Sequence, residues 1–258
     1  MSQLISSKLS FNLKLDKFDH FIQMVDDLSK ISDIIKIKID KDDILMYSMV
    51  GDSAILAFKS FLINTDQYFD LEEVDQLDLI VPGSKKFVKS LSLIKKSDKI
   101  KIDITYRRND DGINIARFFE IKNGKFKLSQ SCGEESEIRN IPKEALEQKL
   151  SLKNKKWSFS ISKENFDDIR KLSNINSENK ILSISVDGDG KVLLSEVSSW
   201  ELEVDEVTVS NKNLMINKSY LSNIDNKSDI SFHIFESFIL IKDDISNLMV
   251  SFETQFED

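Results

Sequence analysis

The chain has 258 residues, of which 40% are hydrophobic and 31% charged, and its net charge at pH 7 is −8. This is the composition of an ordinary soluble globular protein, long enough for one large domain or for two smaller domains with separate cores. Its longest apolar run, Ala54 to Phe58, is far shorter than the roughly 18 residues of a membrane-spanning helix, and the first ten residues lack the apolar block of a secretory signal, so we expect a cytoplasmic protein.

Hydrophobic periodicity divides the first half of the chain into strands and two helices. A strand is expected at 9–15 and a helix at 16–30, with Asp16 as the N-cap. One face of that helix is apolar and carries Phe18, Phe21, Ile22, Val25 and Leu28. The other elements are expected as a hairpin at 34–39 and 44–49, a strand at 54–63, a helix at 84–96, and strands at 99–107, 113–121 and 125–130.

Residues 131–153 are polar, contain Pro142 and show no clean strand pattern, which predicts a connector between domains. We therefore expect an N-terminal domain at 1–130 and a C-terminal domain at 154–258. The elements expected after the connector are a strand at 157–161, a helix at 163–175 capped by Ser162, a hairpin at 181–186 and 192–197, a strand at 201–209, a helix at 218–227, and strands at 230–235, 238–242 and 247–253.

The two halves repeat one pattern in the same order. The matched segments are 9–19 with 157–167, 34–48 with 181–195, and 79–104 with 213–234. Three matches in register predict a duplicated two-domain architecture. The alternative is a pair of unrelated β-rich domains that share generic strand–turn–strand patterning.

Positive charge gathers in one segment of this acidic chain. Residues 84–99 hold six lysines and one aspartate. On a helix, the apolar Phe87, Leu91 and Ile94 fall opposite the basic Lys85, Lys89 and Lys96. A row of lysines without interleaved aromatic side chains suits contact with phosphates without base reading. The alternative is an ordinary solvated helix face.

Residues that carry metal or catalytic chemistry are scarce. Cys132 is the one cysteine, which excludes an internal disulfide and suits a reducing compartment. With this cysteine, His20 and His233 provide few ligands for a zinc or haem site. The segment 186–191, VDGDGK, departs from a calcium loop because the ligand position of the final glutamate is Ser198, so a hairpin turn explains it better. No phosphate-binding loop and no motif around a nucleophilic serine is present. We expect no metal, no cofactor and no enzymatic activity.

Two tandem copies of strand, helix, hairpin, strands, helix and strands, joined near the middle, resemble the DNA sliding clamps. These include the proliferating cell nuclear antigen (PCNA) and the processivity clamp of T-even bacteriophages. The most similar pieces are KSLSLIKKSDKIKI, DDILMYSMVGDSAILAF and the terminal SFETQFED. The resemblance implies an α+β clamp fold in which each of two similar domains has antiparallel sheets outside and two helices on the inner face.

The resemblance further implies a head-to-tail homotrimeric ring. The ring would encircle duplex DNA without sequence preference and tether a replicative DNA polymerase, which makes synthesis processive, and a clamp loader would be a further partner. The DNA-facing residues implied are Lys85, Lys86, Lys89 and Lys96, with Lys163, Arg170, Lys171 and Lys218 as weaker candidates. The first helix, 16–30, carries few basic residues. It therefore departs from the uniformly positive lining expected for the central hole of such a ring. Between subunits, the family suggests strand 113–121 against strand 181–186.

In this family, partner proteins insert a short apolar peptide beside the connector and the C-terminal tail. The matching positions are Met49, Val50, Ile141, Pro142, Phe252 and Phe256. Phe256 lies next to the chain terminus, where a frayed tail is the alternative. The Lys-, Ile-, Asn- and Asp-rich composition suits an AT-rich genome such as that of a bacteriophage or another virus, and the location would then be the host cytoplasm.

Two other functions compete with the replicative clamp. One is a regulatory ring relative with no role in polymerase processivity. The other is a β-rich structural or interaction protein, such as a virion component, whose lysines are incidental. An enzyme comes third.

Overall fold

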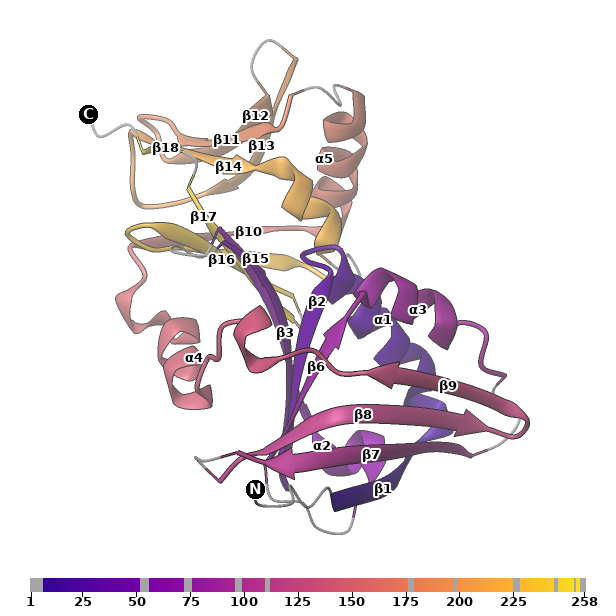
Figure 1. Cartoon of the computed structure of the whole chain (residues 1–258). Coiled ribbons are helices and arrows are strands. Elements are labelled where there is room, and N and C mark those ends of the chain that lie inside the picture. Colours follow the sequence, from indigo (N-terminus) through magenta and orange to yellow (C-terminus); the bar gives the residue numbers. More distant parts are fainter. Residues whose placement is uncertain are drawn as a thin grey trace. The chain divides into compact units, whose positions relative to one another are not determined.

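The computed structural model describes residues 7–51, 56–71, 76–95, 99–109, 112–175, 179–196, 199–224, 228–243, 246–252 and 254–255 (Figure 1). The chain divides into two compact units. Unit 1 comprises residues 1–49 and 60–141, and unit 2 comprises residues 50–59 and 142–258. No described helix has the length and apolar character needed to cross a membrane.

Unit 1 is a sheet with helices α1 and α3 side by side on one face (Figure 1). Its strands run in the order β4-β3-β2-β6-β8-β7-β1-β5, and β9 is a further neighbour of β8. The elements are β1 (Ser7–Leu13), the 3₁₀ turn η1 (Leu15–Lys17), α1 (Phe18–Ser29), β2 (Ile34–Ile39), β3 (Asp43–Val50), β4 (Ala57–Asn64), α2 (Thr65–Tyr68), β5 (Phe69–Asp70), β6 (Leu77–Pro82), α3 (Ser84–Leu91), β7 (Ile100–Arg108), β8 (Asn114–Asn123), β9 (Phe126–Ser131) and η2 (Glu135–Glu137).

The core of unit 1 forms where the apolar faces of the two helices meet the sheet. In α1, four members of the expected stripe are buried and Ile22 is half-buried; the buried ones are Phe18, Phe21, Val25 and Leu28. In the α3 region, Phe87, Leu91 and Ile94 are buried. Ile35, Ile37 and Ile39 of β2 are also buried in this unit. The helical periodicity read from the sequence is therefore confirmed for both helices.

Unit 2 contains two sheets. One has the order β10-β15-β16-β17-β4, where β4 takes part through residues 57–59 that belong to this unit, and the other has the order β13-β12-β11-β14-β18. The elements are α4 (Lys143–Leu150), η3 (Leu152–Asn154), β10 (Trp157–Ile161), α5 (Lys163–Ile175), β11 (Ile181–Val186), β12 (Lys191–Glu196), β13 (Trp200–Glu206), β14 (Lys212–Asn217), η4 (Lys218–Asn223), β15 (Ile230–Ile234), β16 (Phe238–Lys242), β17 (Ser246–Ser251) and β18 (Thr254–Gln255).

Five strand pairings of unit 1 have counterparts in unit 2. In unit 1, β2 pairs with β3 and β6, β1 pairs with β7, and β8 pairs with β7 and β9. In unit 2, β11 pairs with β12 and β14, β10 pairs with β15, and β16 pairs with β15 and β17. The duplication is confirmed, and with it the α+β architecture of two similar domains that carry their helices on one side of the sheets.

Several boundaries differ from the sequence-based expectation. The helix expected at 84–96 ends at Leu91, and the segment expected as a helix at 218–227 contains the 3₁₀ turn η4 instead. The side chain of Asn217 accepts hydrogen bonds from Ser219, and Ser222 Oγ donates to Ser219 O. Such local side-chain bonds compete with α-helix formation. The connector, for which the sequence shows no clean strand pattern, contains α4, the 3₁₀ turn η2 and most of the 3₁₀ turn η3.

The two helix N-caps differ between the copies. Ser162 Oγ accepts from Asn165 N at 3.2 Å, so Ser162 caps α5 as expected. Asp16 is not the cap of α1, because the 3₁₀ turn η1 precedes that helix and Lys17 occupies the cap position without a side-chain bond.

We predict that Ser162→Ala destabilises the protein by about 1 kcal/mol, because the capping hydrogen bond is removed. The thermal unfolding midpoint of the unit 2 transition should fall by about 2–4 °C in calorimetry. Asp16→Ala is the matched control and should change stability by less than about 0.5 kcal/mol. Equal effects of the two substitutions would contradict the assigned cap.

Candidate functional site

Helix α3 presents a row of exposed lysines because its opposite side is buried. Phe87 packs edge-on against Phe119 with ring centroids 5.4 Å apart, and Ser84 Oγ donates to Ser32 O at 3.0 Å. These interactions hold the helix in one rotation about its axis. Lys85, Lys86 and Lys89 are therefore exposed, as the sequence predicts.

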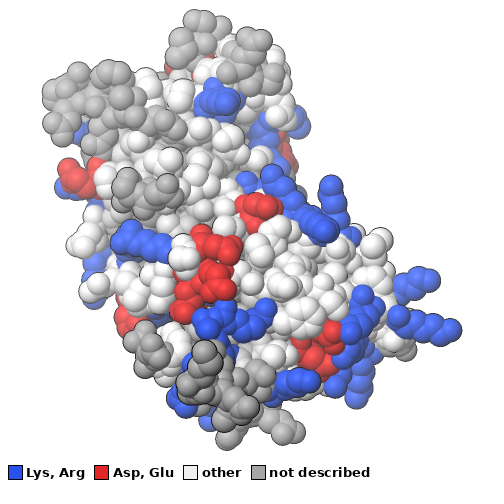
Figure 2. All heavy atoms as spheres, in the orientation of Figure 1, with Lys and Arg blue, Asp and Glu red and all other residues white. Residues whose placement is uncertain are grey.

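The basic surface extends beyond the end of α3. Lys95 and Lys99 are exposed in the segment leading to β7, and Lys96 lies outside the described residues. Figure 2 shows blue side chains gathered on the side of unit 1 where Figure 1 places α3 and the turn between β8 and β9. Positive charge is thus concentrated locally in a chain whose net charge is −8.

The cations of α5 are less available than those of α3. Lys163 is exposed, but Lys171 Nζ lies 2.8 Å from Asp168 Oδ1, and this hydrogen bond raises the pKa of Lys171. Arg170 is half-buried, with its guanidinium 6.0 Å from the ring centroid of Phe166. Helix α5 therefore offers a weaker positive surface than α3.

Lys218 does not present its charge at the surface. Its side chain is 8% exposed, and its Nζ lies 2.6 Å from Oε1 of the fully buried Glu196. The same ammonium donates to Ser173 O at 2.9 Å. The sequence around Lys218 carries no signal of this burial, because Glu196 and Ser173 lie more than twenty residues away. The ammonium of Lys218 is therefore neutralised within unit 2, and it adds little to the exposed positive charge.

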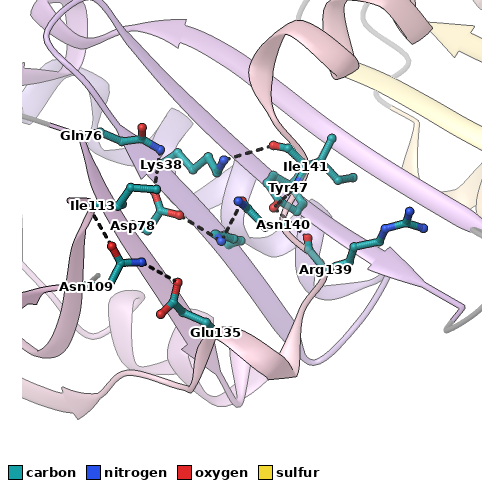
Figure 3. Close-up of polar contacts among 11 residues, drawn as sticks. Lys38, Tyr47, Gln76, Asp78, Asn109, Ile113, Glu135, Arg139, Asn140 and Ile141 are labelled. Carbon is teal, nitrogen blue, oxygen red and sulfur yellow. Dashed lines mark hydrogen bonds and ion pairs between the residues drawn. The ribbon is translucent and has the colours of Figure 1, made fainter. Parts of the chain in front are cut away.

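The first half of the connector is held against the sheet of unit 1 by buried polar side chains (Figure 3). Lys36 of β2 has a side chain only 1% exposed, forms an ion pair with Asp78 Oδ2 at 3.0 Å, and donates to Asn140 Oδ1 at 3.0 Å. A buried charge of this kind is tolerated only when it is paired and hydrogen-bonded. The ion pair therefore ties β2, β6 and the connector together.

Two more side chains fix the connector backbone next to Asn140. Lys38 Nζ donates to Ile141 O at 3.1 Å. Tyr47 OH donates to Arg139 O at 3.0 Å and accepts from Ile141 N at 3.2 Å. Burial raises the pKa of Tyr47, so its hydroxyl stays protonated and keeps its role as a donor. Residues 139–141 are thus held at three consecutive positions.

Sequence reasoning missed this network. In the sequence of β2, IIKIKI, the lysines alternate with isoleucines, and such alternation predicts a solvated polar face. In the structure, the connector covers that face of the sheet. One signal of this burial was present in the sequence. The neighbouring strand β3 is largely apolar, and it carries Tyr47 between Met46 and Ser48, opposite these lysines.

The positions expected to bind a partner peptide differ in how exposed they are. In unit 1, Met49 and Ile141 are buried, each with 9% exposure. In unit 2, Val50 and Phe252 are half-buried and Pro142 is exposed; Phe256 lies outside the described residues.

The described residues contain no group of three or more His, Cys, Asp or Glu side chains placed to hold a metal ion. In the VDGDGK turn, Asp187 Oδ1 accepts from Asp189 N and Lys191 N, both at 2.9 Å, as a hairpin turn requires. Burial raises the pKa of Cys132 to about 12, so this thiol is protonated and unreactive at neutral pH.

No protein-family model and no curated protein sequence matches this chain. Solved structures do match its fold. The chain is similar to the Helicobacter pylori beta clamp bound to a DNA ligase peptide, with a TM-score of 0.66 and 14% identity over 98% of this chain and 68% of that chain. It has the fold of the DNA sliding clamps.

Archaeal clamps match over their whole length. A chain of the PCNA2–PCNA3 complex of Sulfolobus tokodaii has a TM-score of 0.63 and 14% identity, with 96% of this chain and 99% of that chain covered. The A. fulgidus PCNA bound to the C-terminal region of FEN-1 has a TM-score of 0.64 and 10% identity, with 96% and 100% covered. By contrast, this chain spans only 66% to 68% of several bacterial beta clamps. This chain therefore covers nearly all of each PCNA chain but only about two thirds of each bacterial beta clamp.

The buried ion pair gives a direct test of how the connector is held. We predict that Asp78→Ala destabilises the protein by about 3–5 kcal/mol, because Lys36 is left buried and unpaired. The measurement is the free energy of unfolding in urea. Asp70→Ala, which removes an exposed pair with Lys14, should cost less than about 1 kcal/mol. If both variants lose the same free energy of unfolding, the buried Lys36–Asp78 pair contributes no more to stability than an exposed pair.

Proposed function

We propose that this chain is the subunit of a ring-shaped sliding clamp that encircles duplex DNA and tethers a replicative DNA polymerase. The observation that carries the proposal is the duplicated clamp fold with exposed lysines along α3, in a chain that is otherwise acidic. Retention by encirclement needs no tight base contact, and a net charge of −8 is compatible with it when the positive charge is concentrated on one face.

We propose further that the subunits assemble head to tail through β9 and β13. Strand β9 pairs only with β8 among the described strands, and β13 pairs only with β12, so each has an edge open to a partner. The internal repeat supports this choice. Strand β17 is the counterpart of β9, β4 is the counterpart of β13, and β17 and β4 are neighbours in the sheet.

The two strands that the family suggests as the subunit contact, 113–121 and 181–186, both lie inside their sheets. These segments are β8 and β11, and each already has strand neighbours on both sides. Their backbone groups are used within the chain, so they have no open edge to offer a second subunit.

The charges near the two open edges are opposite. Lys125 and Lys127 are exposed at β9, and Glu201, Glu203 and Glu206 are exposed on β13. Both edges also carry half-buried apolar side chains, such as Leu128 on β9 and Leu202 on β13. This complementarity favours head-to-tail association of copies. Such association forms a closed ring when the rotation between neighbouring subunits adds up to a full turn. By analogy with two-domain clamps we propose a homotrimer.

We predict that Lys127→Glu weakens assembly, because it places a like charge against the acidic β13 of the next subunit. In sedimentation velocity, the trimer should dissociate at least tenfold more readily, and Lys127→Glu combined with Glu203→Lys should restore part of the assembly. Lys153→Glu is a control with the same charge change outside both edges. A wild-type protein that stays monomeric at every accessible concentration would overturn the ring.

The basic face of α3 is proposed to bind the DNA backbone. Lys85→Ala with Lys89→Ala should reduce the salt dependence of duplex binding by about 0.9 in log–log slope for each phosphate that is no longer neutralised. Fluorescence anisotropy of a labelled duplex measures this slope, and assembly should be unchanged. Lys153→Ala with Lys212→Ala is the control, because it removes the same charge elsewhere on the chain. An equal change of the salt slope in both double variants would show that α3 does not bind the DNA backbone. Lys86, Lys96 and Lys163 are proposed as further phosphate-binding residues.

Partner binding is proposed at Met49, Val50, Ile141, Pro142, Phe252 and Phe256. The support is that two similar structures carry bound partner segments, a DNA ligase peptide and the C-terminal region of FEN-1. The proposed partners are a DNA polymerase and a clamp loader, and the proposed source is a bacteriophage or another virus, with the protein in the host cytoplasm. A primer-extension assay separates this function from a virion component or a regulatory ring. The product length of a cognate polymerase should increase when the protein is loaded.

A further inference from the structure

The sheet of unit 2 that contains β10, β15, β16 and β17 has one aromatic face and one largely polar face. Phe159 and Phe232 lie opposite each other on the aromatic face, where their rings stack with centroids 4.7 Å apart. Because side chains alternate between the two faces of a strand, the adjacent pair Ser158 and His233 lies on the other face. On that face Ser160 is exposed. The sheet therefore presents polar side chains on the side away from its stacked aromatic rings.

The polar face continues onto two more strands. Lys242 of β16 lies opposite Ser231 of β15 and opposite Asn247 of β17, and all three are half-buried. Lys155, which precedes β10, reaches the same face, since its Nζ donates to Ser158 Oγ at 3.2 Å. Together these side chains form what we call the polar strip, which comprises Lys155, Ser158, Ser231, His233, Lys242 and Asn247.

His233 is the buried member of the polar strip. This residue is 9% exposed, and its Nδ1 is covered by protein without a hydrogen-bond partner within the described part of the chain. Oδ1 of Asn247 is covered and unpaired in the same way. Buried polar atoms are nearly always hydrogen-bonded, so two unpaired ones on one face mark a place where a polar ligand would be stabilised.

The two lysines of the strip carry charge that no described carboxylate neutralises. The ammonium of Lys155 donates to the neutral Ser158, and that of Lys242 has neither a hydrogen bond nor an ion pair in the described structure. Burial first, and then these two charges, lower the pKa of His233, so its imidazole is neutral at pH 7. Both cations therefore act on the same imidazole.

The described carboxylates closest to the strip along the chain are engaged elsewhere. Glu236 pairs with Lys156 at 2.6 Å. Asp243 accepts from the backbone N and from Oγ of Ser246, both at 2.6 Å. An anion brought by another molecule would therefore meet unpaired ammonium groups. A carboxylate suits the strip, because it accepts hydrogen bonds from ammonium, hydroxyl and imidazole N–H groups.

We propose that the polar strip binds a carboxylate side chain of a protein partner, with Lys155 and Lys242 as the cationic contacts and Ser158 and His233 as hydrogen-bond donors. The choice of a protein rests on the proposed function, in which DNA contacts residues on helices, whereas the strip lies on strands. The strip would be a second partner contact, separate from the apolar positions proposed above, and it selects for an acidic segment by charge.

The first experiment combines Lys155→Gln and Lys242→Gln in one full-length chain. The control combines Lys180→Gln and Lys212→Gln, which remove the same charge from exposed positions at the other sheet of unit 2. Anisotropy of a labelled pentaglutamate peptide with blocked termini measures binding at low salt. The affinity of the strip variant should be at least about fivefold lower than that of the control. Equal affinities overturn the proposal, and thermal melting confirms that both variants are folded.

Nuclear magnetic resonance shows where the peptide binds. The chain has two histidines, so the titration of His233 can be followed beside that of His20. A carboxylate close to an imidazole favours its charged form, so pentaglutamate should raise the pKa of His233 by about 0.5 or more and leave that of His20 unchanged. In the free strip variant the pKa of His233 should also be higher than in the wild type, because two repelling charges are removed. Peptide binding that leaves the pKa of His233 unchanged overturns the assigned site.

A labelled DNA duplex tests the other class of anion. If the strip variant loses duplex binding but binds pentaglutamate like the control, the strip contacts nucleic acid and the carboxylate assignment is wrong. The oligomeric state separates this proposal from the ring. A chain that stays monomeric, yet binds pentaglutamate through the strip, keeps this site and overturns the ring. A trimer whose pentaglutamate affinity is equal in both variants keeps the ring and overturns the site.

Discussion

Each unit depends on the burial of one apolar stripe of its helices against a sheet. In unit 1, Phe18 and Phe21 of α1 and Phe87 and Leu91 of α3 are buried, and this packing allows only one rotation of each helix. Because Lys85 and Lys89 lie opposite the buried side of α3, they are exposed as a consequence of the hydrophobic effect. Formation of the core therefore also orients the lysines of the candidate DNA surface, and no ion pairs are needed to orient them.

The other face of the same sheet is covered in a different way. There the connector lies over Lys36, Lys38 and Tyr47, and hydrogen bonds hold residues 139–141. A buried ion pair is weak evidence for stability, but it specifies position well, because any displacement leaves a charge unpaired. The polar network thus sets where the connector runs, and with it the placement of Ile141.

The two copies share their strand pairings but have diverged in their helices. The second helix of unit 1 is an α-helix with exposed lysines, whereas its counterpart in unit 2 is a 3₁₀ turn whose Lys218 is buried. Serine and asparagine side chains in that turn bond to nearby backbone groups and shorten the helix. The counterpart of the exposed basic row in unit 2 is therefore a turn that borders, with α5, an open polar hollow of about 370 Å³.

Local patterns in the amino-acid sequence were sufficient to identify most of the elements, their order and their duplication. Period-two and period-3.6 patterns involve only neighbouring residues, and they revealed the hairpins, the apolar stripe of α1 and the basic stripe of α3. Ser162 was identified as a cap because capping chemistry depends on a few adjacent residues.

Which lysines are covered could be learned only from the folded chain. Lys36, Lys38 and Lys218 are buried by segments distant in sequence, and alternation with apolar residues cannot reveal what lies over a polar face. The same holds for the strands that keep an open edge. The amino-acid sequence does not tell the inner strands β8 and β11 from the edge strands β9 and β13. Their neighbours decide this, and strand pairing joins residues far apart along the chain.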